Sequence, residues 1–222
     1  MTQADLELPR YGEASLSDLL PSVLAALGIR DEVDVLGLPR AERYCVLLVD
    51  GLGWNLLRPH PAEAPFLGSL LSSGRMLTTG APSTTATSIT SLGTGLPPGR
   101  HGVVGYTSRV PGTSDTLLNA LSWHQQVDPL VYQPHPTVFE RAAAAGVEVS
   151  MVSKRQFRGS GLTAAGLRGA RYLGADTLGE RVAAVTSALS GRGPGLVYAY
   201  DSDLDYTGHA HGWDSAAWRH QL

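Results

Sequence analysis

Hydrophobic positions along the chain follow two alternating patterns. The first is helical spacing, in which apolar residues recur every three or four positions before Gly28 stops the run: Leu16, Leu19, Leu20, Val23, Leu24 and Leu27. Pro21 lies inside this stretch, so the helix either begins there or is kinked. The second pattern is the short apolar run of residues 44–49, which is typical of a strand buried on both faces.

The same alternation continues toward the C-terminus. Two capping boxes, Thr137 with Glu140 and Thr177 with Glu180, predict the starts of two helices. The apolar runs that follow them, residues 147–152 and 195–200, predict strands. Earlier in the chain, residues 66–71 predict a helix that ends before Gly74, and residues 75–79 predict a strand. Residues 97–136 show no regular spacing, and we expect them to form a loop over the top of the sheet.

Strands that alternate with helices indicate an α/β fold with a mostly parallel sheet flanked by helices on both faces. No internal repeat and no linker interrupts the sequence. We therefore expect a single domain over residues 1–222, with a helical lead-in at residues 1–40 and the core at residues 44–212.

The composition narrows the possible functions. Hydrophobic residues make up 43% of the chain and charged residues 17%, which is typical of a globular protein and excludes disorder. The 17 basic and 20 acidic residues form no basic stripe, so a nucleic-acid-binding surface is not expected. Cys45 is the only cysteine, which excludes an intrachain disulfide, and we expect it to be buried in the core. No secretion signal or membrane span is recognisable, so we expect a cytoplasmic protein without a membrane partner.

Candidate chemistry follows three of the predicted strands. Asp50 comes directly after the first strand, residues 80–90 are rich in Ser and Thr, and residues 201–212 hold three aspartates and two histidines. Because ligands collect at the carboxyl ends of parallel strands, these segments predict a site for a metal or a phosphate. Asp205 and His209 are four residues apart, so one helical turn would place them on one face. The alternatives are a turn aspartate, a helix cap and a solvated polar loop.

Six motifs occur in order along most of the chain: Val49-Asp50-Gly51, Pro65-Phe66-Leu67, Pro82-Ser83-Thr84-Thr85, Thr94-Gly95-Leu96-Pro97, His101-Gly102-Val103, and a D-x-x-G-H-x-x-G pattern at Asp205, Gly208, His209 and Gly212. Together they resemble the type I phosphodiesterase and nucleotide pyrophosphatase family of the alkaline phosphatase superfamily. The resemblance implies an alkaline-phosphatase-like fold and a metal-dependent phosphoester hydrolase. It also implies a small phosphoester substrate such as a nucleotide.

The resemblance further implies the roles of individual residues. Thr85 aligns with the nucleophile, which forms a phospho-enzyme intermediate, although Thr84 is close enough in sequence to be an alternative. Two divalent metal ions, zinc or manganese, are implied as cofactors. Asp50 and Thr85 would bind one ion, and Asp205 and His209 would bind the other. Ser88 stands where many relatives have an asparagine that binds a phosphate oxygen, so it is the implied substrate-binding residue.

One departure from the family pattern affects the mechanism. The later Asp-His pair and the further His of the family have no counterpart before Leu222, so we expect the fold to be incomplete at the C-terminus and each metal to lack ligands. The alternatives are a phosphomonoesterase, phosphonate hydrolase or phosphomutase of the same superfamily, or an inactive metal-binding fragment. His101 is expected to be a structural hydrogen-bonding residue. The basic turn at residues 154–158 is either a solvated loop or a contact for a substrate anion.

Overall fold

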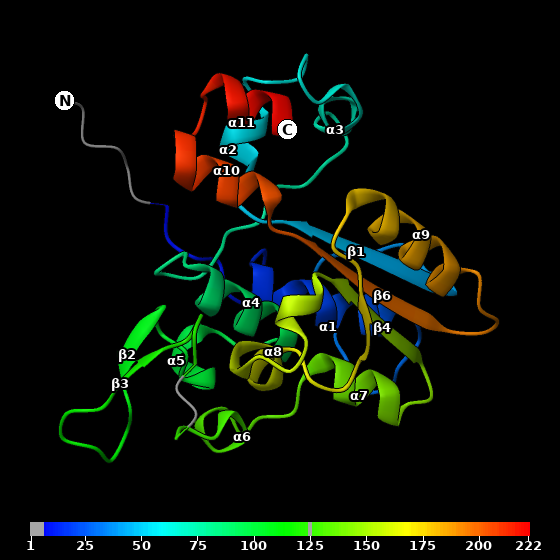
Figure 1. Cartoon of the computed structure of the whole chain (residues 1–222). Helices are drawn as coiled ribbons and strands as arrows, with labels where there is room; N and C mark the ends of the chain where they lie inside the picture. Colours follow the sequence, from blue (N-terminus) through cyan, green and yellow to red (C-terminus); the bar gives the residue numbers. More distant parts are fainter. Residues whose placement is uncertain (1–6, 124–125) are drawn as a thin grey trace.

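A four-stranded parallel sheet with helices on both faces forms the centre of the protein, which we describe from a computed structural model over residues 7–123 and 126–222 (Figure 1). The strand order is β1 (Arg43–Val49), β6 (Gly195–Asp201), β4 (Glu148–Ser153) and β5 (Arg171–Gly174), and every neighbouring pair is parallel. This confirms the α/β fold that the sequence predicts. The first six residues of the expected lead-in lie outside the described residues.

Helices cover both faces of this sheet. The helices α1 (Leu16–Ala26), α4 (Thr85–Thr94) and α7 (Val138–Ala144) contribute to the main core, and α9 (Leu178–Leu189) covers the opposite face (Figure 1). The main core includes Leu20, Leu24, Leu92, Phe139, Leu196 and Tyr198, and each of these side chains is fully buried. The smaller core under α9 includes Ala188, Val197 and Ala199. Burial of this apolar surface stabilises the layered arrangement.

Both capping boxes predicted from the sequence are confirmed, and the structure decides where helix α1 begins. Helix α1 begins at Leu16 and includes Pro21, which rules out a helix that starts at the proline. In the first capping box the backbone N–H of Thr137 donates to Glu140 at 2.8 Å, and the backbone N–H of Glu140 donates to the Thr137 hydroxyl at 3.1 Å. The second box, at the start of α9, has the same two bonds.

Two strand predictions need correction. The run at residues 44–49 forms β1, but β1 is an edge strand and not a strand buried on both faces. Cys45 is consequently exposed, contrary to the expectation, and 60% of Leu47 is exposed. The expected strand at residues 75–79 is wrong, because only Thr78 forms a bridge there, with Ser15. Apolar composition alone does not reveal how many neighbours a strand has.

The segment predicted as a loop contains short elements and lies mostly beside the sheet. A two-stranded antiparallel sheet of β2 (Thr107–Arg109) and β3 (Leu117–Asn119) lies away from the four-stranded sheet (Figure 1). A separate core cluster that includes Val103, Leu118 and Trp123 stabilises this region. The remaining elements are α2 (Trp54–Leu57), α3 (Pro65–Leu70), α5 (Pro98–His101), α6 (Pro129–Tyr132), a 3-10 helix (Arg155–Phe157), α8 (Gly161–Gly166), α10 (Asp203–His211) and α11 (Ala216–Gln221). Within the described ranges, no helix is long and apolar enough to cross a membrane.

His101 is a buried structural residue, as the sequence predicted. Its ring is 1% exposed, Nδ1 accepts the backbone N–H of Val103 at 3.1 Å, and Nε2 lies 2.9 Å from the Ser91 hydroxyl. Because Nδ1 accepts, the neutral ring carries its proton on Nε2 and donates it to Ser91. Burial, and secondarily the charge of His135, lower the pKa of His101 from 6.5 to about 4.

This depressed pKa predicts a specific loss of stability in acid. Between pH 6.5 and 4 the unfolded chain binds a proton at His101 and the folded chain does not, so the free energy of unfolding falls by about 3 kcal/mol as the pH drops. We expect His101→Gln to remove this pH dependence, measured by urea unfolding at pH 7.5 and 4.5. His135→Gln is the control and should retain most of it. An identical pH dependence in His101→Gln and the unmodified protein would contradict the assignment.

Candidate active site

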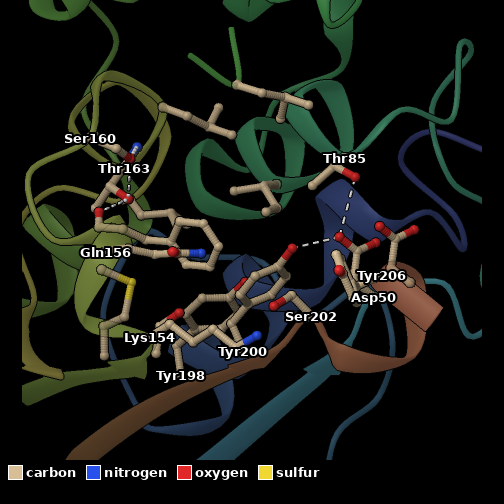
Figure 2. Close-up of a pocket in the computed structure, with 18 of the residues that line it drawn as sticks. Asp50, Thr85, Lys154, Gln156, Ser160, Thr163, Tyr198, Tyr200, Ser202 and Tyr206 are labelled. Atoms are coloured by element: carbon tan, nitrogen blue, oxygen red, sulfur yellow. Dashed lines mark hydrogen bonds between the residues drawn. The ribbon is translucent and has the colours of Figure 1, made fainter. Parts of the chain in front are cut away.

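The three chemically suggestive segments meet at the carboxyl ends of β1 and β6. Asp50 follows β1, Thr85 is the first residue of α4, and α10 follows β6 and carries Asp205 and His209. All four side chains line one cavity of about 320 Å³, and Figure 2 labels Asp50 and Thr85 in it. The structure therefore brings together Thr85 and the three other residues that the family resemblance implies as metal ligands, whereas the alternative Thr84 does not line this cavity.

A hydrogen-bonded group centred on Asp50 forms one end of this cavity. The Thr85 hydroxyl donates to Oδ2 of Asp50 at 3.2 Å, and the Tyr200 hydroxyl donates to the same oxygen at 2.5 Å (Figure 2). The other oxygen, Oδ1, accepts the backbone N–H of Gly51 at 3.0 Å. Burial and the nearby Asp50 charge raise the pKa of Tyr200, so this hydroxyl keeps its proton and remains a donor. These bonds fix the Asp50 carboxylate beside the Thr85 oxygen.

The neighbouring threonines differ in what they contact. Thr84 caps α4, because its hydroxyl oxygen accepts the backbone N–H of Thr87 at 3.5 Å, and it donates to the Thr87 hydroxyl at 3.0 Å. Thr85 is the next residue and its side chain lines the cavity. Its hydroxyl lies at the positive end of the helix dipole, where the first backbone N–H groups favour an anion such as phosphate. The two threonines thus differ in their contacts: Thr84 caps the helix, and Thr85, which aligns with the family nucleophile, faces the cavity.

The second pair of residues, Asp205 and His209, lies on one face of α10. Nε2 of His209 is 3.6 Å from Oδ1 of Asp205, as expected for positions four residues apart. Helix α10 passes close to Gly51, where a Cβ would lie 2.6 Å from the Asp205 Cα and where φ is +74°. Only glycine permits so close an approach of the two backbone segments at this φ. The approach places Asp205 near Asp50. Burial and the Asp50 charge raise the pKa of Asp205, and His209 opposes that effect.

The donor set fits a divalent cation in kind but does not complete a coordination shell. Carboxylates, an imidazole and a hydroxyl face one cavity, and the Asp50–Asp205 pair carries negative charge that a cation would offset. However, in residues 7–123 and 126–222 no group of three or more His, Cys, Asp or Glu side chains could hold a metal ion. A catalytic zinc generally has three protein ligands and an open position. The residues described here supply two donors to each ion that the family resemblance implies.

Ser88 is not brought into the cavity. It is half-buried on α4, one turn after Thr85, and is not among the cavity-lining residues. Its role in substrate binding stays a prediction. In the basic turn, Lys154 lines the cavity and pairs with Asp203, whereas Arg155 pairs outside it with carboxylates of residues 176 and 180.

Tyr200 is the site residue that sequence reasoning missed. It lies at the end of β6, five residues before Asp205, inside an apolar run that reads simply as a buried strand. The contact with Asp50 joins residues 150 positions apart and depends on β1 and β6 being neighbours. A tyrosine at the carboxyl end of a strand was the only signal available.

The family model described as type I phosphodiesterase / nucleotide pyrophosphatase matches residues 44–222, which is most of the chain. The chain belongs to this family. Solved structures of murine ectonucleotide pyrophosphatase / phosphodiesterase 5 share the fold. One superposes with a TM-score of 0.60 at 19% identity, and an inactive form in complex with AMP superposes with a TM-score of 0.62 at 19% identity.

The superposition covers only part of the murine protein. It includes 80% and 81% of this phosphodiesterase-family chain and 48% of the murine chain in both structures, so the chain spans about half the length of these relatives. Among curated proteins, none matches the sequence. At this level of identity the likeness concerns the fold, and the family assignment depends on the match over residues 44–222.

Proposed function

We propose that the chain is a phosphoester hydrolase in which Thr85 is the nucleophile. The observation that carries the proposal is the Thr85 hydroxyl, which donates to Asp50 at the start of α4 inside the cavity. Membership of the phosphodiesterase family supports the reaction class. A threonine hydroxyl is a weak nucleophile by itself, so the acceptor beside it and the positive helix end are needed.

The proposed reaction has two steps. The Thr85 oxygen attacks phosphorus and loses its proton, the bond from phosphorus to the leaving oxygen breaks, and the leaving group departs as an alcohol after protonation. The phosphoryl group then remains on Thr85 as an ester. A water molecule attacks the same phosphorus, the bond from phosphorus to Thr85 breaks, and the hydroxyl regains a proton. Backbone N–H groups in the first turn of α4 bind the phosphoryl oxygens during both steps.

Two divalent cations, zinc or manganese, belong to this proposal as cofactors. Asp50 and Thr85 would hold one ion, and Asp205 and His209 would hold the other. A bound dication lowers the pKa of a coordinated hydroxyl and stabilises charge on the attacking and leaving oxygens. The closeness of Asp205 to Asp50 supports a cation at this position, because a positive charge would offset the repulsion between the two carboxylates.

A phosphodiester with a nucleotide-like part is the substrate class that we propose. The family description and the complex of the murine relative with AMP support it. The same scaffold can act on many esters, so the substrate class needs a direct test.

The test compares diesters and monoesters with the same leaving group. Purified protein is supplied with zinc or manganese and assayed on bis-p-nitrophenyl phosphate, the p-nitrophenyl ester of thymidine 5′-monophosphate, and p-nitrophenyl phosphate. We expect metal-dependent release of p-nitrophenol, with kcat/KM at least about tenfold higher for the diesters than for the monoester, which corresponds to about 1.4 kcal/mol. A preference for the monoester would reassign the chain to a phosphomonoesterase of the same superfamily.

The described residues supply only two donors to each proposed metal ion, which favours a second candidate function. In this alternative the chain is a domain that binds metal without turnover. It predicts zinc binding by calorimetry that persists in Thr85→Ala, with no p-nitrophenol released by the unmodified protein. Turnover that requires Thr85 would rule this candidate out.

A further inference from the structure

Helix α10, which carries Asp205 and His209, is only weakly held by apolar packing. Leu204 is its one buried residue in the described structure, and the side chain of His209 is 80% exposed. Trp218 of α11 lies against Gly208 near the far end of the helix. The helix also starts without a side-chain cap, because Ser202 makes no capping bond. Something else must fix the first turn of α10.

A group of four charged side chains meets at that first turn. Arg181 of α9 donates through Nη2 to Asp201 at 2.8 Å and to Asp203 at 2.7 Å. Lys154, which follows β4, donates to the other carboxylate oxygen of Asp203. The backbone N–H of Asp203 donates to Oδ1 of Asp201 at 2.8 Å. These residues, Lys154, Arg181, Asp201 and Asp203, are called the four-charge cluster below.

The cluster is neutral overall and partly removed from water. Two positive and two negative side chains alternate, and Arg181 is the most buried, with 7% of its side chain exposed. The Asp203 side chain is 29% exposed and that of Lys154 is 23% exposed. Charges that are partly removed from water are screened less than fully exposed ones, and loss of one cation leaves the cluster with a net negative charge. Nη2 of Arg181 donates to both carboxylates while Nη1 donates to the Asp176 carbonyl at 3.0 Å, so the planar guanidinium is held on both sides and fixes where the two carboxylates lie.

The cluster lies immediately before the residues of the candidate site. Asp203 is the first residue of α10, and Asp205 follows two positions later, against Gly51. A rotation of the helix start would therefore move Asp205 and His209 away from Asp50 and Thr85. Arg181 does not line the cavity, so any effect on the site passes through the segments that it holds, the end of β6 at Asp201 and the start of α10 at Asp203.

We propose that Arg181 and Lys154 are positioning residues, which hold the start of α10 so that Asp205 and His209 face Asp50 and Thr85. The inference rests on the proposed function for its catalytic consequence. The structural part, the orientation of α10, is independent of turnover.

The structural part is tested by amide hydrogen exchange of residues 203–211 in the full chain. We expect exchange to accelerate about 100-fold in Arg181→Met and about tenfold in Lys154→Met, because each leaves a partly buried carboxylate without one of its cations. Lys154→Met alters a half-buried residue and keeps the test available if Arg181→Met does not fold. Arg141→Met is the matched control, because it removes a partly buried ion pair with Glu32 that is remote from α10. Unchanged exchange of α10 in Lys154→Met, or equal acceleration in the control, would overturn the inference.

The catalytic part is tested by steady-state kinetics at a temperature where every variant is fully folded. We expect kcat to fall at least about tenfold in Arg181→Met, to recover partly in Arg181→Lys, and to stay close to the unmodified value in Arg141→Met. A kcat of fully folded Arg181→Met within about twofold of the unmodified value would overturn the positioning role. If α10 exchange accelerates but the unmodified protein hydrolyses no ester, the cluster still orients α10 and the proposed function is the part that fails.

Discussion

Replacing Thr85 with alanine should lower kcat/KM for bis-p-nitrophenyl phosphate by at least about 1000-fold, because the variant has no oxygen to attack phosphorus. The side chain is half-buried, and its one side-chain hydrogen bond goes to Asp50. Stability should therefore change little, and the loss would be one of chemistry. The measurement is the rate of p-nitrophenol release with metal present.

Thr84→Ala is the control for this experiment. Its hydroxyl caps α4 and does not line the cavity, so we expect a loss of about 1 kcal/mol of stability with kcat/KM within a few fold of the unmodified protein. The opposite pattern, in which Thr84→Ala is inactive and Thr85→Ala is active, would move the nucleophile to Thr84. Equal activity in both variants would contradict a threonine nucleophile.

Asp205→Asn should reduce hydrolysis by at least about 100-fold and at the same time stabilise the metal-free protein. Hydrolysis falls because the amide is a poorer donor to a cation than the carboxylate. Stability rises because burial and the Asp50 charge disfavour the ionised form of Asp205 in the folded state. A residue whose substitution increases the stability of the protein is typical of a functional site.

The pH dependence of stability determines whether Asp205→Asn should stabilise or destabilise the protein. Since the pKa of Asp205 is higher in the folded than in the unfolded chain, ionisation of Asp205 destabilises the fold, and this cost disappears as the pH falls through the folded pKa. Urea unfolding of metal-free protein at pH 7.5 should thus show a higher free energy of unfolding for Asp205→Asn than for the unmodified protein. Asp115→Asn, an exposed loop substitution, is the control and should have no effect. A destabilised Asp205→Asn protein would contradict the account.

Local signals in the sequence predicted most of the fold. Capping boxes at Thr137 and Thr177 marked two helices correctly, and the apolar runs near β4 and β6 were confirmed as strands within one residue at each end. These signals work because hydrogen bonds within four residues and a continuous apolar run act locally.

Features that depend on neighbouring elements were not predictable in the same way. The run at residues 44–49 resembles the buried strand β6 in composition, yet β1 lies at the edge of the sheet and leaves Cys45 and Leu47 exposed. The strand order β1-β6-β4-β5 joins segments that are far apart in the sequence, and no local pattern encodes it.

The candidate site shows the same difference between features with a local signal and features that depend on distant segments. Asp50, Asp205 and His209 were recognisable because their residue types and positions at strand ends suggest metal chemistry, and the structure places them in one cavity with Thr85. The contributions of Tyr200 and Arg181 were not recognisable, because each acts through a contact with a distant or separately folded segment.

The central claim is that Thr85 becomes covalently phosphorylated during turnover, and rapid quenching in acid tests it most directly. Unmodified protein with metal and bis-p-nitrophenyl phosphate is quenched within the first turnover, digested, and sequenced by mass spectrometry. The account predicts the p-nitrophenyl phosphoryl group on Thr85 and its absence from Thr85→Ala. Steady hydrolysis with no modified peptide, or with the group on another residue, would contradict it.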